Sequence, residues 1–281
     1  MADLTTKAPL IYGKSIPVLG FGTYLSTGDE CYNAVRHALK TGYRHVDTAA
    51  FYRNENLVGA AIRDSGIKRE EVFVTTKLWN TDQGYDSTLK AFEKSLAALN
   101  LDYVDLYLIH WPIPTGHAHD YRQLNADSWR AMLRLKNEGV IKSLGVSNFL
   151  PQHIDELMTT TDSLPEVNQI EMHPGLNQTE TVEYCKTKGI VVEAWRPVLK
   201  GGADNIPAVK KIANAHGVTS SQICLSWLLH KGVVPLPKSV TPSRIEENAN
   251  VFGITLNESE IAEIDNIPEI RLGSHPLTLN K

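Results

Sequence analysis

The sequence has few cysteines, no block of like charge and no long apolar run. Its 281 residues include three cysteines, Cys31, Cys185 and Cys224. This odd, scattered set predicts neither a disulfide framework nor a metal site built on C-x-x-C spacing. No apolar run approaches the ~18 residues of a membrane span, and Met1 to Pro9 lacks the apolar core of a signal peptide. We therefore expect a soluble cytoplasmic protein with reduced thiols.

Charge is nearly balanced along the chain. There are 28 Lys and Arg residues against 32 Asp and Glu, which gives a formal charge of −4 at pH 7. Without a basic block, neither a nucleic acid nor another polyanion is the expected partner. A hydrophobic fraction of 42% is enough for a sizeable core, and no linker or low-complexity segment divides the chain. We expect one α/β domain over residues 1–281.

A glycine-rich phosphate turn is missing as well. Gly20-Phe21-Gly22 has the start of a dinucleotide fingerprint, but the third glycine would fall at Leu25. The segment also ends a predicted hairpin, in which Leu10-Ile11-Tyr12 and Ile16 to Leu19 flank a turn at Gly13-Lys14. Because the fingerprint must follow a strand of a βαβ unit, we do not expect this segment to bind a nucleotide.

The sequence does contain a regular alternation of strands and helices. Short, apolar, β-branched runs predict strands buried on both faces, and each is followed by an amphipathic run with helical spacing. Eight such units fit a (β/α)8 barrel, whereas the alternative, a doubly wound sheet, usually has a glycine-rich turn after its first strand. The predicted strands are 44–47, 71–77, 104–110, 141–146, 167–171, 190–195, 233–237 and, weakly, 250–253. The predicted helices are 30–41, 54–65, 85–99, 126–138, 151–160, 179–188, segments within 205–231, 242–249 and 258–266.

Polar side chains follow three successive predicted strands. Asp47 ends the first, Tyr52 lies in the loop beyond it, and Lys77 and His110 end the next two. These ends meet if the strands are parallel in one sheet. A nearby ammonium stabilises a phenolate and eases proton transfer from a phenol, whose ordinary pKa is about 10. We expect Lys77, held and kept charged by Asp47, to assist Tyr52 as a proton donor, while His110 orients the substrate oxygen.

Six motifs in order resemble those of a known family. They are RHVDTAAFYRNE, VTTKLWN, DLYLIHWP, GVSNF, VNQIEMHP and PKSVTPSRIEEN, within a match from about residue 10 to about residue 273. The sequence resembles the aldo-keto reductases, and among them the compact 2,5-diketogluconate reductases and the prostaglandin F synthase-like members. The resemblance implies a (β/α)8 barrel closed at the bottom by the N-terminal hairpin. It also implies the same roles for Asp47, Tyr52, Lys77 and His110.

Reduction of a carbonyl needs a hydride, and because no side chain supplies one, a nicotinamide cofactor is required. Ser147, Asn148 and Gln169 follow or end strands and carry groups suited to its carboxamide, a role that the resemblance assigns to them. Trp195 offers a flat face for the ring. The chain has Trp195-Arg196-Pro197 where many family members have Tyr-Ser-Pro. The role of Arg196 stays open: it could bind a cofactor phosphate, select anionic substrates or simply point to water.

A second cofactor-binding group surrounds the turn before the helix at 242–249. Its members are Lys238, Ser239, Thr241, Arg244, Glu247 and Asn248. Two cations and two hydroxyls fit a 2′-phosphate, so we expect NADPH/NADP+ in preference to NADH. In the family, the positions of Glu247 and Asn248 meet the adenine. A solvated helix face with an i,i+3 pair between Arg244 and Glu247 is the alternative.

Aromatic side chains after strand ends and after the hairpin are expected to line the substrate pocket. They are Tyr24, Phe51, Trp79 and Trp111. The tail after Pro268 is short, whereas long-tailed family members build a substrate lid there, so an open pocket is expected.

Two further patterns are expected to carry no chemistry. His117-Ala-His119-Asp120 lies in a predicted loop without other ligands at useful spacing, so no metal site is expected. Asn177 and Asn257 match the glycosylation pattern, but both precede predicted helices and are interpreted as N-caps.

These features predict a monomer that reduces aldehydes and ketones to alcohols, with a hydride from C4 of the nicotinamide and a proton from Tyr52. A narrow sugar-derivative reductase of the diketogluconate type is the alternative enzyme. Outside the enzymes, the alternative is a non-catalytic cofactor-binding auxiliary protein. The intact set of Asp47, Tyr52, Lys77 and His110 argues against that last alternative.

Overall fold

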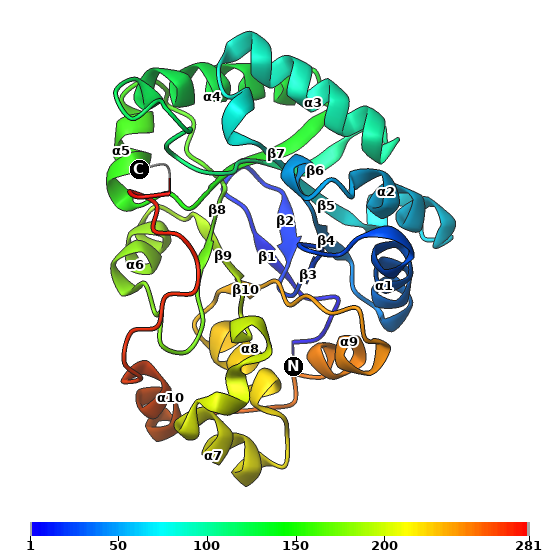
Figure 1. The fold of residues 1–281 in the computed structure, drawn as a ribbon, viewed down its shortest axis with the longest axis vertical. Coiled ribbons are helices and arrows are strands. Elements are labelled where there is room, and N and C mark those ends of the chain that lie inside the picture. Colours follow the sequence, from blue (N-terminus) through cyan, green and yellow to red (C-terminus); the bar gives the residue numbers. More distant parts are fainter. Residues whose placement is uncertain (1, 280–281) are drawn as a thin grey trace.

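Eight parallel strands form the centre of the protein, and helices surround them (Figure 1). The structure is a computed structural model and describes residues 2–279. The sheet order is β10-β9-β8-β7-β6-β5-β4-β3. Its strands are β3 (Phe21–Gly22), β4 (His45–Asp47), β5 (Phe73–Leu78), β6 (Val104–Ile109), β7 (Ile141–Ser147), β8 (Val167–Glu171), β9 (Val191–Trp195) and β10 (Val234–Pro235). The helices are α1 (Gly28–Thr41), α2 (Glu55–Asp64), α3 (Tyr85–Leu99), α4 (Tyr121–Asn137), α5 (Pro151–Met158), α6 (Thr179–Thr187), α7 (Pro207–His216), α8 (Ser220–His230), α9 (Pro242–Ala249) and α10 (Glu258–Asp265).

Two glycines close the sheet into a barrel. The Gly20 N–H donates to the Pro235 carbonyl at 3.0 Å, and the Gly22 N–H donates to the Pro237 carbonyl at 2.9 Å. A Cβ on Gly22 would lie 3.2 Å from the Leu236 carbonyl oxygen, so the close approach of the two segments favours glycine. The predicted (β/α)8 barrel is confirmed.

Two predicted elements at the ends of the barrel are wrong in position. Residues 250–253 form a turn, in which the Ile254 N–H donates to the Val251 carbonyl, and the eighth strand is β3. The N-terminal hairpin pairs β1 (Lys7–Pro9) with β2 (Ser15–Pro17), so residues 10–14 are its turn and not one of its arms. The apolar run Leu10-Ile11-Tyr12 suggested a hairpin arm, but the Leu10 side chain is buried from within the turn.

The hairpin seals the lower end of the barrel. Ile16 of β2 and Leu10 pack in a small apolar cluster with side chains from three barrel strands, β5, β6 and β8. Those barrel residues are Phe73, Leu106, Leu108 and Val167. The opposite end of the barrel, where the strands finish, therefore remains for polar side chains.

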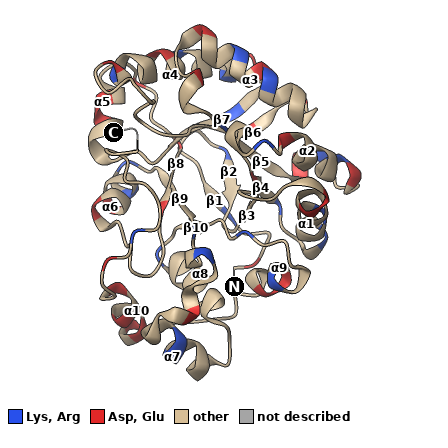
Figure 2. Ribbon diagram, in the orientation of Figure 1, with Lys and Arg blue, Asp and Glu red and all other residues tan. Residues whose placement is uncertain are grey.

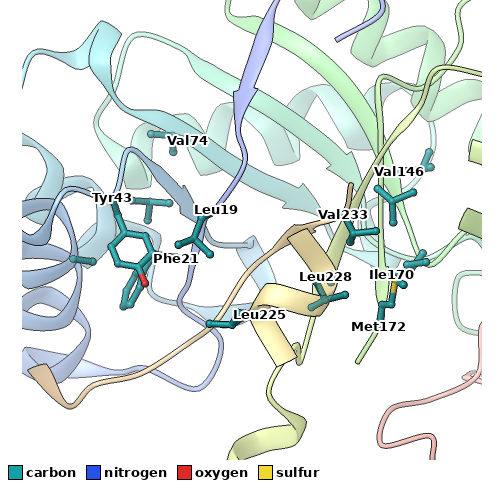
Figure 3. Packing of buried hydrophobic residues seen from close by; sticks show 14 of the residues in the cluster. Leu19, Phe21, Tyr43, Val74, Val146, Ile170, Met172, Leu225, Leu228 and Val233 are labelled. Atoms are coloured by element: carbon teal, nitrogen blue, oxygen red, sulfur yellow. The ribbon is translucent and has the colours of Figure 1, made fainter. Parts of the chain in front are cut away.

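The main core lies between the barrel and its helices. Figure 3 shows Phe21 and Tyr43 side by side, with Leu225 and Leu228 of α8 facing the strands. Helix α1 shows why the sequence folds this way, since Cys31, Val35 and Ala38 recur at helical spacing and are fully buried. Gly42 then ends the helix with φ 119°, a left-handed conformation that suits glycine.

Charged residues of both signs are spread over the outer helices, whereas the barrel strands carry few (Figure 2). None of the helices within residues 2–279 is long and apolar enough to cross a membrane.

Candidate active site

The expected four residues meet at the C-terminal end of the barrel, with Lys77 at their centre. Lys77 Nζ donates to Asp47 Oδ1 at 2.6 Å, to the Thr48 carbonyl at 2.9 Å and to the Tyr52 hydroxyl at 3.3 Å. Asp47 ends β4, Lys77 lies in β5 and Tyr52 lies in the 3₁₀ turn Ala50–Tyr52. The Lys77 side chain is fully buried, so its ammonium acts on the phenol without screening by water.

Asn54 fixes the loop that carries Tyr52. Its amide donates to the Thr23 and Ser26 carbonyls at 2.9 and 3.0 Å, and its oxygen accepts from Thr48 Oγ1 at 2.7 Å. Asn54 stands just before α2, but its side chain ties two loops together and does not cap the helix.

Burial and charge act in opposite directions on the tyrosine. Burial raises the pKa of Tyr52 to about 12, although the Lys77 ammonium lowers it. Burial alone would lower the pKa of Lys77, but the Asp47 carboxylate and Tyr52 outweigh it and raise that pKa above its ordinary value. At neutral pH the site therefore holds a protonated phenol beside a charged ammonium.

His110 follows β6 and lies edge-on to Tyr52, with ring centroids 5.8 Å apart. Burial, together with the charge of Lys77, lowers the pKa of His110 well below its ordinary value. The imidazole is therefore neutral at pH 7 and can donate one hydrogen bond. Its Nδ1 is buried and has no hydrogen-bond partner among residues 2–279.

Three side chains expected at the nicotinamide, those of Ser147, Asn148 and Trp195, form hydrogen bonds between the ends of β7 and β9. Asn148 Nδ2 donates to the His110 carbonyl at 2.9 Å and to Ser147 Oγ at 3.1 Å. Trp195 Nε1 donates to Asn148 Oδ1 at 2.9 Å. This chain of contacts fixes the indole of Trp195 relative to His110.

Gln169 of β8 contacts two carboxyl groups. Its Nε2 donates to Asp47 Oδ2 at 2.8 Å and to Glu193 Oε2 at 2.9 Å. Glu193 was not predicted as a site residue. The available signal was a glutamate in the middle of the otherwise apolar run Val191-Val192-Glu193-Ala194.

The structure gives Arg196 a definite neighbour. Its guanidinium carbon lies 5.0 Å from the Trp195 ring centroid, and its Nη1 lies 3.7 Å from Glu171 Oε1. The Glu171 carboxylate also accepts from the N–H groups of Leu272 and Gly273, each at 3.0 Å. Arg196 thus lies where the C-terminal tail packs on Trp195.

The tail is packed so closely there that a Cβ on Gly273 would come 2.3 Å from Trp195 Cη2 and 2.9 Å from Arg196 Nη1. Tail, arginine and indole therefore form one unit at the mouth of the barrel.

The expected pocket aromatics fall into two groups. Phe51 stacks on Trp79 at 3.8 Å, and Tyr24 lies 5.0 Å from Tyr52. The Trp111 ring belongs to the second group, with its centroid 6.5 Å from that of Trp195. Tyr24 and Phe51 remain 40% and 44% exposed, so the first group forms an open apolar rim.

The residues expected at the cofactor phosphate gather at the start of α9. The Thr241 N–H donates to Ser239 Oγ at 3.1 Å, which shapes the turn. Within residues 2–279, Lys238 and Arg244 have no ion-pair partner, so both charges are available. Arg244 and Glu247 form no pair there, and Glu247 instead accepts from Thr219 Oγ1 at 2.8 Å.

Of the two expected N-caps, only one is present. Asn257 Oδ1 accepts from the Glu260 N–H at 3.0 Å and caps α10. Asn177 does not cap α6, because its amide donates to the Asp265 carbonyl at 2.8 Å.

Comparison with known proteins identifies the family of this site. A sequence model of the "Aldo/keto reductase family" matches residues 18–269. The chain belongs to the aldo/keto reductase family. The expected enzyme class, an NADP-dependent oxidoreductase of this family, is thereby confirmed.

Similar proteins extend over nearly the whole of this aldo/keto reductase. A glyoxal reductase of Bacillus subtilis is 44% identical over 276 residues, which is 98% of this chain and 97% of that protein. The crystal structure of an aldo/keto reductase from Brucella melitensis is 46% identical, with a TM-score of 0.87, and the match covers 92% of this chain and 98% of the other. A Bombyx mori aldo-keto reductase in complex with NADP is 36% identical, with a TM-score of 0.86 and coverage of 94% and 93%.

Proposed function

We propose that this aldo/keto reductase reduces small aldehydes and ketones to alcohols with NADPH, and that Tyr52 is the proton donor. The observation that carries the proposal is the Lys77 ammonium, placed 2.6 Å from Asp47 and 3.3 Å from Tyr52. The similarity to a glyoxal reductase and to a reductase that binds NADP supports the substrate class and the cofactor.

The side chains at the barrel mouth fit such a cofactor. The side-chain hydrogen bonds of Gln169 within residues 2–279 all come from Nε2 and leave Oε1 without one, and the buried Asn248 Oδ1 has no partner in the same part of the chain. These free acceptors suit the carboxamide and the adenine, and the unpaired Lys238 and Arg244 suit a 2′-phosphate. Ser147, Asn148 and Trp195 complete the nicotinamide end, and Ser239 and Thr241 the phosphate end.

When bound, NADPH supplies a hydride from C4 of its nicotinamide to the carbonyl carbon. The protein must then deliver a proton as negative charge develops on the carbonyl oxygen. Tyr52 gives up its hydroxyl proton, and the Lys77 ammonium stabilises the phenolate that is left. Asp47 holds Lys77 in place, and the neutral His110 donates a hydrogen bond that orients the substrate oxygen. The aromatic rim of Tyr24, Phe51, Trp79 and Trp111 receives the apolar part of the substrate.

The test is NADPH oxidation with methylglyoxal, phenylglyoxal and 4-nitrobenzaldehyde, and with xylose as a sugar comparison. Tyr52→Phe should lower kcat by about 10²–10⁴-fold, the usual contribution of general acid catalysis, while NADPH still binds. Tyr32→Phe is the matched control, because that hydroxyl donates to Asp64 of α2 at 2.7 Å and accepts from Arg36 of α1 at 3.1 Å. Near-normal turnover by Tyr52→Phe would refute the proton-donor role.

A further inference from the structure

A glutamate is buried inside the barrel beside the candidate active site. Glu193 lies in the middle of β9, in register with Gln169 of β8 and Val234 of β10, and its side chain has no exposed surface. Within residues 2–279, no lysine or arginine pairs with it. A buried carboxyl group without a cation destabilises the fold unless it is hydrogen-bonded or protonated. The presence of Glu193 at this position therefore needs an explanation.

Glu193 and Asp47 together determine which way the Gln169 amide points. The nitrogen donates to Asp47 Oδ2 at 2.8 Å and to Glu193 Oε2 at 2.9 Å, which uses both of its hydrogens. With the carboxyl proton of Glu193 on Oε1, the oxygen that faces His45 Nε2, the opposite orientation would place the amide oxygen against two acceptor oxygens. Without Glu193, only one contact would oppose that reversal. The amide oxygen is the group left without a partner.

The side chain of His45, from β4, lies beside that of Glu193. It lies on β4, two residues before Asp47, so both side chains are on the same face of the strand. His45 Nε2 lies 3.5 Å from Glu193 Oε1 and 3.1 Å from Thr75 Oγ1. A Cβ on Gly20 would lie 2.7 Å from His45 Nδ1, so a glycine there leaves room for the ring.

Glu193 adds a hydrogen bond to the site without adding charge. Asp47, Lys77 and His45 are the titratable groups around Glu193. Burial, together with the charge of Asp47, raises the pKa of Glu193 to about 8, against the opposing effects of Gln169 and Lys77. Burial and the charge of Lys77 lower the pKa of His45 to about 3. At neutral pH both groups are uncharged, so Lys77 keeps Asp47 as its one carboxylate partner among residues 2–279.

We propose that Glu193, with His45 facing its other carboxyl oxygen, is a positioning residue that fixes the Gln169 amide with its oxygen presented to the nicotinamide carboxamide. Glu193 touches none of the reacting groups and acts through Gln169. This inference rests on the proposed function, because it requires that NADPH binds with its carboxamide at Gln169.

The test compares binding of NADPH with binding of 2′-phospho-ADP-ribose, which lacks the nicotinamide. Glu193→Met keeps the length of the side chain but removes the acceptor, and it should raise the NADPH Kd about tenfold, the loss expected for one buried hydrogen bond. The Kd of 2′-phospho-ADP-ribose should change by no more than about twofold, as for a site without direct contact. Glu193→Gln keeps an acceptor oxygen and should bind NADPH nearly as wild type does.

A double-mutant cycle tests whether the effect passes through Gln169. In a Gln169→Leu background, Glu193→Met should add no further loss of NADPH affinity, because the amide to be oriented is gone. Additive losses, equal losses for both ligands, or equal losses for the Met and Gln variants would each overturn the inference. If Glu193→Met does not fold, Glu193→Thr, which is too short to reach Gln169, takes its place. A wild-type protein that does not bind NADPH would overturn the proposed function itself.

Discussion

Replacing Lys77 by methionine tests the centre of the site for stability and catalysis at once. The ammonium is fully buried and donates to Asp47, Thr48 and Tyr52. Lys77→Met keeps much of the side-chain volume but leaves the buried Asp47 carboxylate without its cation. Removal of one partner of a buried ion pair costs about 3–5 kcal/mol. For a chain of this size that corresponds to a fall in Tm on the order of 10 °C.

The assay is thermal unfolding of four proteins: wild type, Lys77→Met, Asp47→Asn and the double variant. The second substitution removes the unpaired charge, so the double variant should be more stable than the sum of the single losses predicts. Lys211→Met is the control, because Lys211 pairs with Glu263 at 2.9 Å and is 72% exposed. An exposed pair contributes less than about 1 kcal/mol. Strictly additive losses, or a Lys77 effect no larger than that of Lys211, would refute the reasoning.

Three further predictions concern the cofactor end, the tail and pH. Arg244→Ala should raise the NADPH Kd by about 10–100-fold, the cost of a charge-assisted hydrogen bond, and leave the NADH Kd nearly unchanged; equal weakening of both would remove the 2′-phosphate role. Arg196→Ala removes the cation between Glu171 and Trp195 and should cost about 1–2 kcal/mol in urea unfolding. An unchanged midpoint would show that the tail N–H groups, together with His173 and Arg271, satisfy Glu171 without Arg196. The folded-state pKa of Glu193, about 8, lies above its ordinary value of 4.5, so wild-type stability falls with pH across that window because only the unfolded chain releases the proton. Glu193→Gln lacks this ionisable group, so its free energy of unfolding relative to wild type should rise by roughly 3–5 kcal/mol between pH 4.5 and pH 8. A stability difference that stays constant with pH would contradict the prediction.

The convergence of Asp47, Lys77 and His110 could be predicted because it depends on topology alone. Strands joined by helical crossovers are parallel, and the C-terminal ends of parallel neighbours lie at one edge. A residue that ends such a strand is therefore placed without knowledge of its contacts. Tyr52 follows because the loop after Asp47 is too short to carry it far away.

The strand that closes the barrel could not be predicted in the same way. β3 has only two residues, Phe21 and Gly22, and the bonds that close the barrel come from the N–H groups of Gly20 and Gly22. Backbone bonds of this kind leave no side-chain pattern in the sequence. The segment 250–253 was only weakly predicted as a strand, and that prediction is wrong because the segment forms a turn.

Side-chain contacts between elements far apart in the sequence could not be predicted either. A glutamate in an apolar strand signals that a partner exists, but only the closed barrel shows that His45 and Gln169 are the partners of Glu193. The same holds for Arg196, whose partner Glu171 also binds a tail from the far end of the chain. In both cases the type of residue indicated that a polar partner exists, but the identity of that partner depended on how the chain is arranged in the closed barrel.

The balance of burial against charge at Tyr52 also has a consequence for the direction of the reaction. Lys77 lowers the pKa of Tyr52 as expected, but burial outweighs it and the pKa is raised to about 12. The phenol therefore keeps its proton throughout the neutral range, so carbonyl reduction always starts from the correct protonation state and its rate should depend little on pH there. Alcohol oxidation needs the phenolate, whose population rises about tenfold for each step of one in pH below the pKa. Oxidation with NADP+ should therefore accelerate steeply with pH while reduction does not. Parallel pH profiles in the two directions would show that Tyr52 is not the group that exchanges the proton.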